Sequence, residues 1–235
     1  MPSLVAALGA PYPYVLTPAG EQLKAVTKNL SGGERPGFDS AFLFWNVFGV
    51  PGAPPLPFLL QFGGDDGSVF GISPGNVYDN IDTVYQLDSD PALSPDEEIL
   101  NANVLRVASD PQGRHPNGLA GIPVISGDIR IPVVSIHTLG DLFVPFSHEQ
   151  NYARRVAAHG KADLLVTRAI RDVGHCFFAV PEEAAAFQAL LDWVDTGVKP
   201  AGDDVLDAAN VAAADFGCNF TLFNRPIPGL SACTP

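Results

Sequence analysis

The feature that most constrains the fold is a pair of apolar, β-branched runs that flank a helix-like segment. The runs occupy residues 131–138 and 164–170, and the segment between them covers residues 147–159. In the first run apolar residues occupy both faces, as a buried parallel strand requires. A second helix-like segment follows at 181–196. Strand, helix, strand and helix in this order predict an α/β fold with a parallel sheet.

Each of the two runs ends at a glycine that precedes a chemically active side chain. The first breaks at Gly140 and is followed by Asp141, and the second breaks at Gly174 and is followed by His175. Catalytic and ligand-binding groups collect at this edge of an α/β sheet. Taken alone, Asp141 could be a turn or helix-capping residue, and His175 a structural histidine. Together they suit an acid–base pair, because a carboxylate that orients one imidazole nitrogen leaves the other to accept a proton.

These motifs also resemble a known family. The segment from His137 to Pro145, followed by a helix and then by Asp172-Val173-Gly174-His175, resembles the C-terminal part of α/β-hydrolase-fold serine esterases and lipases. The resemblance covers residues 129–197. It implies an α/β-hydrolase-like parallel sheet portion, with Asp141 as the triad acid and His175 as the triad base. It further implies hydrolysis of carboxylic esters through an acyl-enzyme, without a cofactor or a metal.

The family also needs a nucleophilic serine, which the sequence supplies poorly. The literal match to G-x-S-x-G places Ser73 upstream of the acid, in the correct order. Pro74 follows it, however, and has no N–H for the oxyanion. Ser126 lies directly before the acid strand, and Ser147 is assigned as a helix cap. Cys176 adjoins the base, and neighbouring side chains of a strand point apart. The sequence therefore favours a nucleophile and first strands outside this chain, as in the C-terminal part of a larger hydrolase.

The chain is expected to have three parts. Residues 1–128 are a large irregular or helical, lid-like segment, residues 129–199 are the hydrolase β-α-β-α unit, and residues 200–235 are a Pro-rich tail. The tail carries Cys218 and Cys233, which could form a disulfide or remain two free thiols. A disulfide favours a secreted or cell-envelope protein, although the first residues do not resemble a signal peptide.

Local patterns in the first half predict three elements. A short helix is expected at 19–29. The aromatic residues 38–48 predict either a buried helix or hairpin, or an apolar wall that faces a lipophilic substrate. Ser94 and Glu97 are placed for a capping box, with a helix that extends to about residue 107.

Two helices are expected in the second half. Ser147 and Gln150 predict a capping box, and Gly160 a C-terminal stop. The last helix, 181–196, has an apolar stripe typical of a core-facing surface, formed by Phe187, Leu190, Leu191 and Val194.

Composition excludes several classes of protein. A formal net charge of −13 argues against nucleic-acid binding, which needs clustered Lys and Arg. The sequence has no run of about 20 apolar residues that would span a membrane, and no Cys/His cluster that suggests zinc.

The function predicted from sequence is thus a carboxylic-ester hydrolase that acts on a small apolar ester. The alternative is a catalytically incomplete hydrolase fragment that acts as an association or structural module. Its exposed sheet edge would bind a second copy of the chain or a complementing N-terminal chain.

Overall fold

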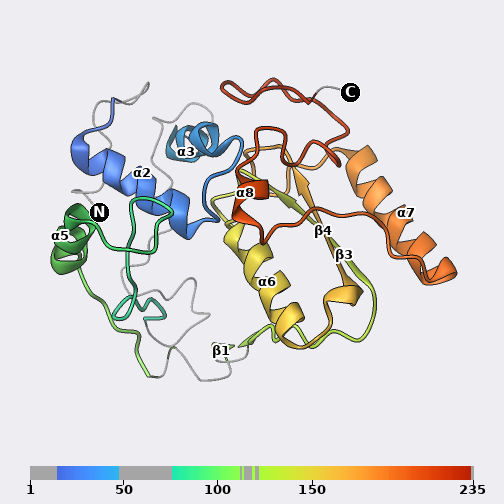
Figure 1. Ribbon diagram of the computed structural model, residues 1–235, viewed down its shortest axis with the longest axis horizontal. Helices are drawn as coiled ribbons and strands as arrows, with labels where there is room; N and C mark the ends of the chain where they lie inside the picture. The colour runs from blue at the N-terminus through green and yellow to red at the C-terminus, as the bar shows by residue number, and fades with distance from the viewer. Residues whose placement is uncertain (1–14, 48–75, 112, 114–117, 120–121, 234–235) are drawn as a thin grey trace. The chain divides into compact units, whose positions relative to one another are not determined.

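The computed structural model describes residues 15–47, 76–111, 113, 118–119 and 122–233 (Figure 1). The chain divides into two compact units, which are described separately. One contains Met1–Val26 and Asn46–Ile125, and the other contains Thr27–Trp45 and Ser126–Pro235. Residues 27–45, which the sequence analysis grouped with the lid-like segment, therefore belong with the sheet.

The second unit is built on two parallel strands. Strand β3 (Val133–Thr138) pairs with β4 (Leu165–Ile170), in a register that sets Val133 opposite Leu165 and Thr138 opposite Ile170. Helix α6 (Ser147–Ala158) and the short 3₁₀ helix η1 (Ala162–Leu164) connect them. The predicted β-α-β unit is present. Figure 1 shows α6 and α7 (Val180–Thr196) on either side of the strand pair.

The two strands differ in how their outer edges are covered. Every residue of β4 is buried, and the tail runs along its outer edge. There the Asp203 amide donates to Thr167 O at 2.7 Å, and the Ala169 amide donates to Asp203 Oδ2 at 2.8 Å. Strand β3 is mostly half-buried and, among the described residues, pairs with β4 alone.

Helix α6 does not begin as predicted. Ser147 is its first residue rather than its cap, and the capping position is taken by Phe146, which has helical backbone angles and no side-chain cap. The reason is packing, because Phe146 is fully buried. Gln150 instead donates to the carbonyls of Gly32 and Val205. The predicted stop is confirmed, since Gly160 has a φ of 66°.

Helix α7 ends at Thr196, the predicted residue, but turns a different face to the protein. Its buried residues are Glu182, Ala186 and Trp193. The stripe predicted to face the core is half-buried at Leu190 and exposed at Phe187, Leu191 and Val194. The buried face is therefore set by Glu182, Ala186 and Trp193, and not by the predicted apolar stripe.

The core of this unit joins both strand ends to the tail. Its cluster of buried side chains comes from the turn after β3, the start of α6, β4 and the tail, including α8 (Ala208–Val211). The members are Leu139, Phe146, Ala169, Val205, Val211 and Phe216. The tail is thus part of the core rather than an appendage.

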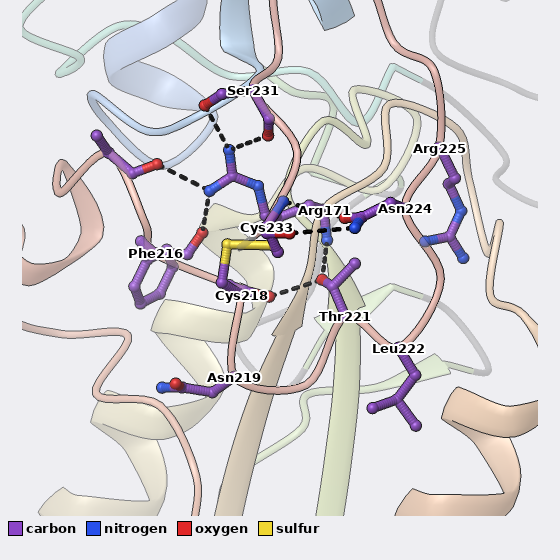
Figure 2. Close-up of a disulfide and its surroundings, with 12 residues drawn as sticks. Arg171, Phe216, Cys218, Asn219, Thr221, Leu222, Asn224, Arg225, Ser231 and Cys233 are labelled. Atoms are coloured by element: carbon purple, nitrogen blue, oxygen red, sulfur yellow. Dashed lines mark hydrogen bonds between the residues drawn. A yellow bond between two sulfur atoms is a disulfide. The ribbon is translucent and has the colours of Figure 1, made fainter. Parts of the chain in front are cut away.

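A disulfide between Cys218 and Cys233 closes the tail beside the end of β4 (Figure 2). Arg171, the residue after β4, reaches into this loop. Its guanidinium donates to the carbonyls of Ala214, Phe216 and Ser231 at 2.8, 3.1 and 2.9 Å. Burial lowers the pKa of Arg171, with Asp215 opposing that effect.

Removal of this disulfide should lower stability. The cysteines are 15 residues apart, and a loop of that size stabilises by about 3 kcal/mol through the unfolded chain. Cys218→Ser combined with Cys233→Ser should lower the free energy of unfolding in urea by about that amount. Cys176→Ser, at an exposed free thiol, is the control. Equal stability of all three proteins would contradict the prediction.

Glu149 on α6 should destabilise the protein when charged. It is buried, its Oε2 accepts from the Ser135 hydroxyl at 2.9 Å, and its Oε1 has no partner among the described residues. Burial raises the pKa of Glu149, and the Ser135 bond only partly opposes this. Because the folded pKa lies above the unfolded one, the penalty is complete above the folded pKa and absent below the unfolded one.

Glu149→Gln should therefore raise the free energy of unfolding by about 1 kcal/mol at pH 7. The gain should disappear near pH 3.5, roughly a unit below the ordinary pKa of a glutamate. Urea denaturation at the two pH values measures it, with the exposed Glu183→Gln on α7 as the control. A gain that is the same at both pH values would show that charge is not its cause.

In the other unit, side chains within residues 76–110 bond repeatedly to the backbone, as when Arg106 donates to the carbonyls of Asn80 and Thr83. Helix α5 (Pro95–Asn103) has the predicted capping box, in which Ser94 and Glu97 bond each other's amides. It ends four residues earlier than expected, where Val104 is already extended. A short antiparallel pair is formed by β1 (Gly118–Leu119) and β2 (Ile122–Pro123).

The two helices at the start of the chain match the sequence expectations in type. Helix α2 covers Pro18–Leu30. Helix α3 covers Phe38–Val47 and buries Phe38, Phe42 and Trp45. The aromatic segment is thus a buried helix over its described residues. No helix in the described part of the chain is long and apolar enough to cross a membrane.

Candidate functional site

The two residues singled out from the sequence lie at the same edge of the sheet. Strands β3 and β4 are parallel and end together, at Thr138 and Ile170. Asp141 follows three residues after the first end, and His175 five residues after the second. The structure brings them into contact, with His175 Nδ1 2.6 Å from Asp141 Oδ2.

Asp141 uses its two oxygens for different purposes. Oδ1 accepts from the amides of Phe143 and Val144 at 2.8 and 2.9 Å, which fixes the turn after β3. Oδ2 accepts from His175. Asp141 is therefore both a turn residue and an imidazole partner, and the turn bonds hold the second oxygen in place.

This contact assigns the proton positions on His175. A carboxylate can only accept, so Nδ1 carries the hydrogen and the neutral ring keeps a free lone pair on Nε2. The Asp141 side chain is 4% exposed and that of His175 is 38% exposed. A buried carboxylate thus orients an imidazole that is partly exposed to solvent.

The loops after β3 and β4 are bonded to each other. Thr138 Oγ1 donates to Gly174 O at 2.7 Å, and the Gly140 amide donates to Asp172 O at 2.8 Å. A Cβ on Gly140 would lie 2.6 Å from the Cα of Val173, so only glycine permits this approach. The backbone itself sets the Asp141–His175 separation.

Trp45 on α3 bonds to both the loop after β3 and the loop after β4. Its indole Nε1 donates to Gly140 O at 2.9 Å and to Val173 O at 2.8 Å. Its ring also stacks on Phe143, whose edge meets the His175 ring with centroids 4.9 Å apart. Trp45 therefore positions the acid and base loops together, a role that the sequence analysis did not find.

Trp45→Phe should loosen this arrangement. It removes the donor shared by two carbonyls, which should cost about 1–3 kcal/mol of folding stability, and it should lower turnover in any reaction that uses the Asp141–His175 pair. Trp193→Phe on α7 deletes the same atoms from another buried tryptophan and is the matched control. Urea denaturation and turnover should be measured for both variants. Both variants can lose stability, but only Trp45→Phe should alter turnover by more than its loss of folded protein explains.

Arg35 bonds to the backbone of the turn that follows β3 and leads to Asp141. Its Nε donates to Leu139 O at 2.6 Å, and its guanidinium lies over the Phe38 ring. Burial lowers the pKa of Arg35 to about 10, although Glu34 opposes this. The buried guanidinium thus fixes the backbone just before Asp141.

The base loop is tied to the tail by Arg225. Its Nε lies 2.6 Å from Asp172 Oδ2, one Nη donates to Glu182 Oε2 at 2.6 Å, and the same nitrogen donates to Phe177 O at 3.1 Å. Asp172 Oδ1 in turn accepts from the Gly174 amide at 2.9 Å. Arg225 therefore contacts the chain on both sides of His175, at Asp172 before it and at Phe177 after it.

Cys176 lies closer to the base than the sequence suggested. Residues 175–176 form a turn rather than a strand, and Cys176 has a φ of 54°. Its Sγ is 3.7 Å from Nε2 of His175 and 3.8 Å from Nδ1. The expectation that the two side chains point apart is wrong, because it assumed strand geometry.

The two candidate serines among the described residues make hydrogen bonds elsewhere than at this site. Ser73 lies outside the described residues. Ser126 accepts from the Asp128 amide, and Ser147 begins α6 with its amide bonded to Ser31 O. Within the described ranges, no three His, Cys, Asp or Glu side chains are grouped so as to hold a metal ion.

Comparison with known proteins gives one partial similarity. No protein-family profile and no solved structure matches the chain. An o-phthalyl amidase of Xanthobacter agilis is 33% identical to it over 76 residues, which are 32% of this chain and 17% of the amidase. The chain thus matches only about a sixth of the length of that relative. The similarity points to a hydrolase in general terms.

Proposed function

We propose that this chain carries the acid–base pair of a serine hydrolase of the α/β-hydrolase type, with His175 as general base and Asp141 as the residue that orients it. The observation that carries the proposal is the 2.6 Å bond between Nδ1 and a buried carboxylate, which leaves Nε2 as the nitrogen without a carboxylate partner in a partly exposed ring. The resemblance of the two loops to esterase and lipase motifs supports it, as does the partial similarity to an amidase.

The proposed mechanism follows from the protonation state of the ring. Nε2 takes the proton of a serine hydroxyl as its oxygen attacks the substrate carbonyl, and later gives that proton to the leaving group. Asp141 stabilises the imidazolium that forms between these steps. Water then attacks the acyl-enzyme as Nε2 takes its proton, and that proton passes to the serine oxygen when the carboxylic acid leaves. Ser73, or a serine on a complementing N-terminal chain, is the proposed nucleophile.

The surroundings of His175 suit an apolar acyl group. Phe143 and Phe177 are 43% and 52% exposed, and the rings of Phe44 and Phe177 meet edge-on. The proposed substrate is therefore a small apolar ester. The name of the partial relative adds amides of an aromatic acid as a second substrate class. The Cys218–Cys233 disulfide supports a secreted or cell-envelope location.

Active-site labelling tests the proposal. A fluorophosphonate should label one serine of the full-length protein, and His175→Gln should abolish the labelling because the hydroxyl then lacks its base. Peptide mapping locates the serine, and Ser73→Ala shows whether it is Ser73. Parallel assays on a p-nitrophenyl ester and the matching p-nitroanilide separate esterase from amidase action. Labelling that persists in His175→Gln would contradict the proposal.

A second candidate function is favoured by a separate observation. Among the described residues β3 lacks a second strand partner, and α7 exposes Phe187, Leu191 and Val194. An open strand edge beside apolar side chains suits association through added strands. In this alternative the chain is a catalytically incomplete module that binds a second copy or a complementing chain. Sizing under native conditions tests it, and an active monomer would exclude it.

A further inference from the structure

The disulfide-closed loop of the tail, residues 218–233, lies against the segment that carries His175. That segment, residues 171–177, is called the base loop. The amide of Arg171 donates to Thr221 Oγ1 at 2.9 Å. Its guanidinium donates to Ser231 O at 2.9 Å, so the two arms of the tail loop meet at one residue (Figure 2). The tail loop is therefore attached to the base loop where the base loop begins.

Arg225 attaches the tail loop at two further points of the base loop. Its Nε lies 2.6 Å from Asp172 Oδ2, and one Nη donates to Phe177 O at 3.1 Å. Asp172 Oδ1 also accepts from the Gly174 amide, the amide next to His175. The guanidinium thus holds the base loop on both sides of the imidazole.

Asn224 connects Arg225 to the disulfide. Asn224 Nδ2 donates to Cys233 O at 3.1 Å, and the Cys233 amide donates to Asn224 Oδ1 at 3.0 Å. The residue that precedes Arg225 is thus bonded twice to one end of the disulfide (Figure 2). A continuous series of contacts leads from the disulfide through Asn224 and Arg225 to the base loop.

We propose that the Cys218–Cys233 disulfide is a redox-dependent clamp on the base loop, and that its reduction by a small dithiol lets His175 move away from Asp141. A thiolate of the dithiol attacks one sulfur of the disulfide. The S–S bond breaks, giving a mixed disulfide and a cysteine thiolate that takes up a proton. The second thiolate of the reagent then displaces the other cysteine. The dithiol leaves oxidised, as a cyclic disulfide, and two cysteine thiols remain.

The closed loop opposes the release of Arg225. Both cysteines are partly exposed, so a small reagent can reach the bond between them. While that bond is intact, Asn224 and Arg225 belong to a closed loop and cannot move far from Arg171. Opening the loop restores conformational freedom to this segment and favours its detachment. Once Arg225 leaves, the base loop loses a contact on each side of His175.

Hydrogen exchange tests the clamp without any substrate. The full-length protein is compared before and after treatment with dithiothreitol, in a Cys176→Ser background that has no third thiol. Global weakening speeds exchange in all segments, so the measured quantity is the rate of residues 171–178 relative to α6. Reduction should raise this ratio at least about tenfold, because the base loop then opens while α6 stays folded. Reoxidation should reverse the change, and an unchanged ratio would overturn the clamp.

A variant that keeps the disulfide tests the path through Asn224. Asn224→Ala removes both bonds to Cys233 and should raise the same ratio without any reductant, though by less than reduction does. Asn219→Ala is the matched control, since Asn219 lies in the same loop but bonds to Asp203. Equal ratios for the two variants would exclude Asn224 as the connection.

The state of His175 is measured directly by NMR of ¹⁵N-labelled histidine. The Nδ1 proton bonded to Asp141 should be visible in the oxidised protein, absent from His175→Gln, and lost to exchange with water after reduction. A signal that reduction leaves unchanged would contradict the proposal. Loss of ester hydrolysis on reduction, and its recovery on reoxidation, rest on the proposed function. Failure of this last arm alone would mean that the hydrolase proposal is wrong and the clamp is real.

Discussion

Asp141→Asn is expected to lower kcat for ester hydrolysis by about 1,000- to 10,000-fold without unfolding the protein. Oδ1 of Asp141 accepts two backbone bonds, from Phe143 and Val144. In the variant the amide oxygen must stay there to keep those bonds, so the NH₂ group replaces Oδ2 and faces Nδ1 of His175. Two donors cannot bond each other. The ring is therefore driven to the tautomer with its hydrogen on Nε2, which cannot accept a proton.

The measurement is steady-state hydrolysis of a p-nitrophenyl ester by the full-length protein, together with far-ultraviolet circular dichroism. Asp195→Asn, an exposed substitution on α7, is the matched control and should leave kcat unchanged. A kcat for Asp141→Asn within a factor of about ten of wild type would mean that the carboxylate does not set the tautomer of a catalytic base.

Arg225→Ala is expected to lower the free energy of unfolding by about 3–5 kcal/mol at pH 7. Asp172 and Glu182 are both buried, and each has an oxygen 2.6 Å from an Arg225 nitrogen. Burial raises the pKa of Asp172, and the hydrogen bond from Gly174 and the charge of Arg225 only partly offset this. Burial would also raise the pKa of Glu182, but the bonds from Arg225 and from the backbone outweigh it and lower that pKa. Without the guanidinium, two carboxylates remain in the interior without their cation.

The effect should depend on pH in a defined direction. Because the folded pKa of Glu182 is depressed, its contribution is complete above the unfolded pKa and is lost as pH falls through the folded one. The difference between wild type and Arg225→Ala should therefore shrink in acid. Urea denaturation at several pH values measures it. Arg225→Lys should be intermediate, and Arg130→Ala, at an exposed arginine, should be neutral. A loss below about 1 kcal/mol at pH 7 would show that the cluster contributes no more than a surface pair.

The sequence predicted those features that depend on local pattern. The two strands follow from runs of apolar, β-branched residues, and the glycines after them place Asp141 and His175 at one edge of a parallel pair. The end of a helix at a glycine such as Gly160 follows from backbone conformation alone. These inferences need no knowledge of distant partners.

The features that sequence reasoning missed depend on tertiary contacts. Trp45 bonds carbonyls that lie 95 and 128 residues away, and no local pattern indicates that link. Ser147 has the composition of a cap, but burial of Phe146 moves the helix start. Cys176 was judged with strand geometry, whereas the chain turns there.

The central claim is that Asp141 and His175 act as one unit in a hydrolase, and a double-mutant cycle tests it most directly. We would measure kcat/KM for a p-nitrophenyl ester in wild type, Asp141→Asn, His175→Gln and the double variant. Residues that act as a unit have strongly non-additive effects. The account predicts that the double variant is no slower than His175→Gln alone. Losses that multiply, or single variants that retain wild-type turnover, would contradict it.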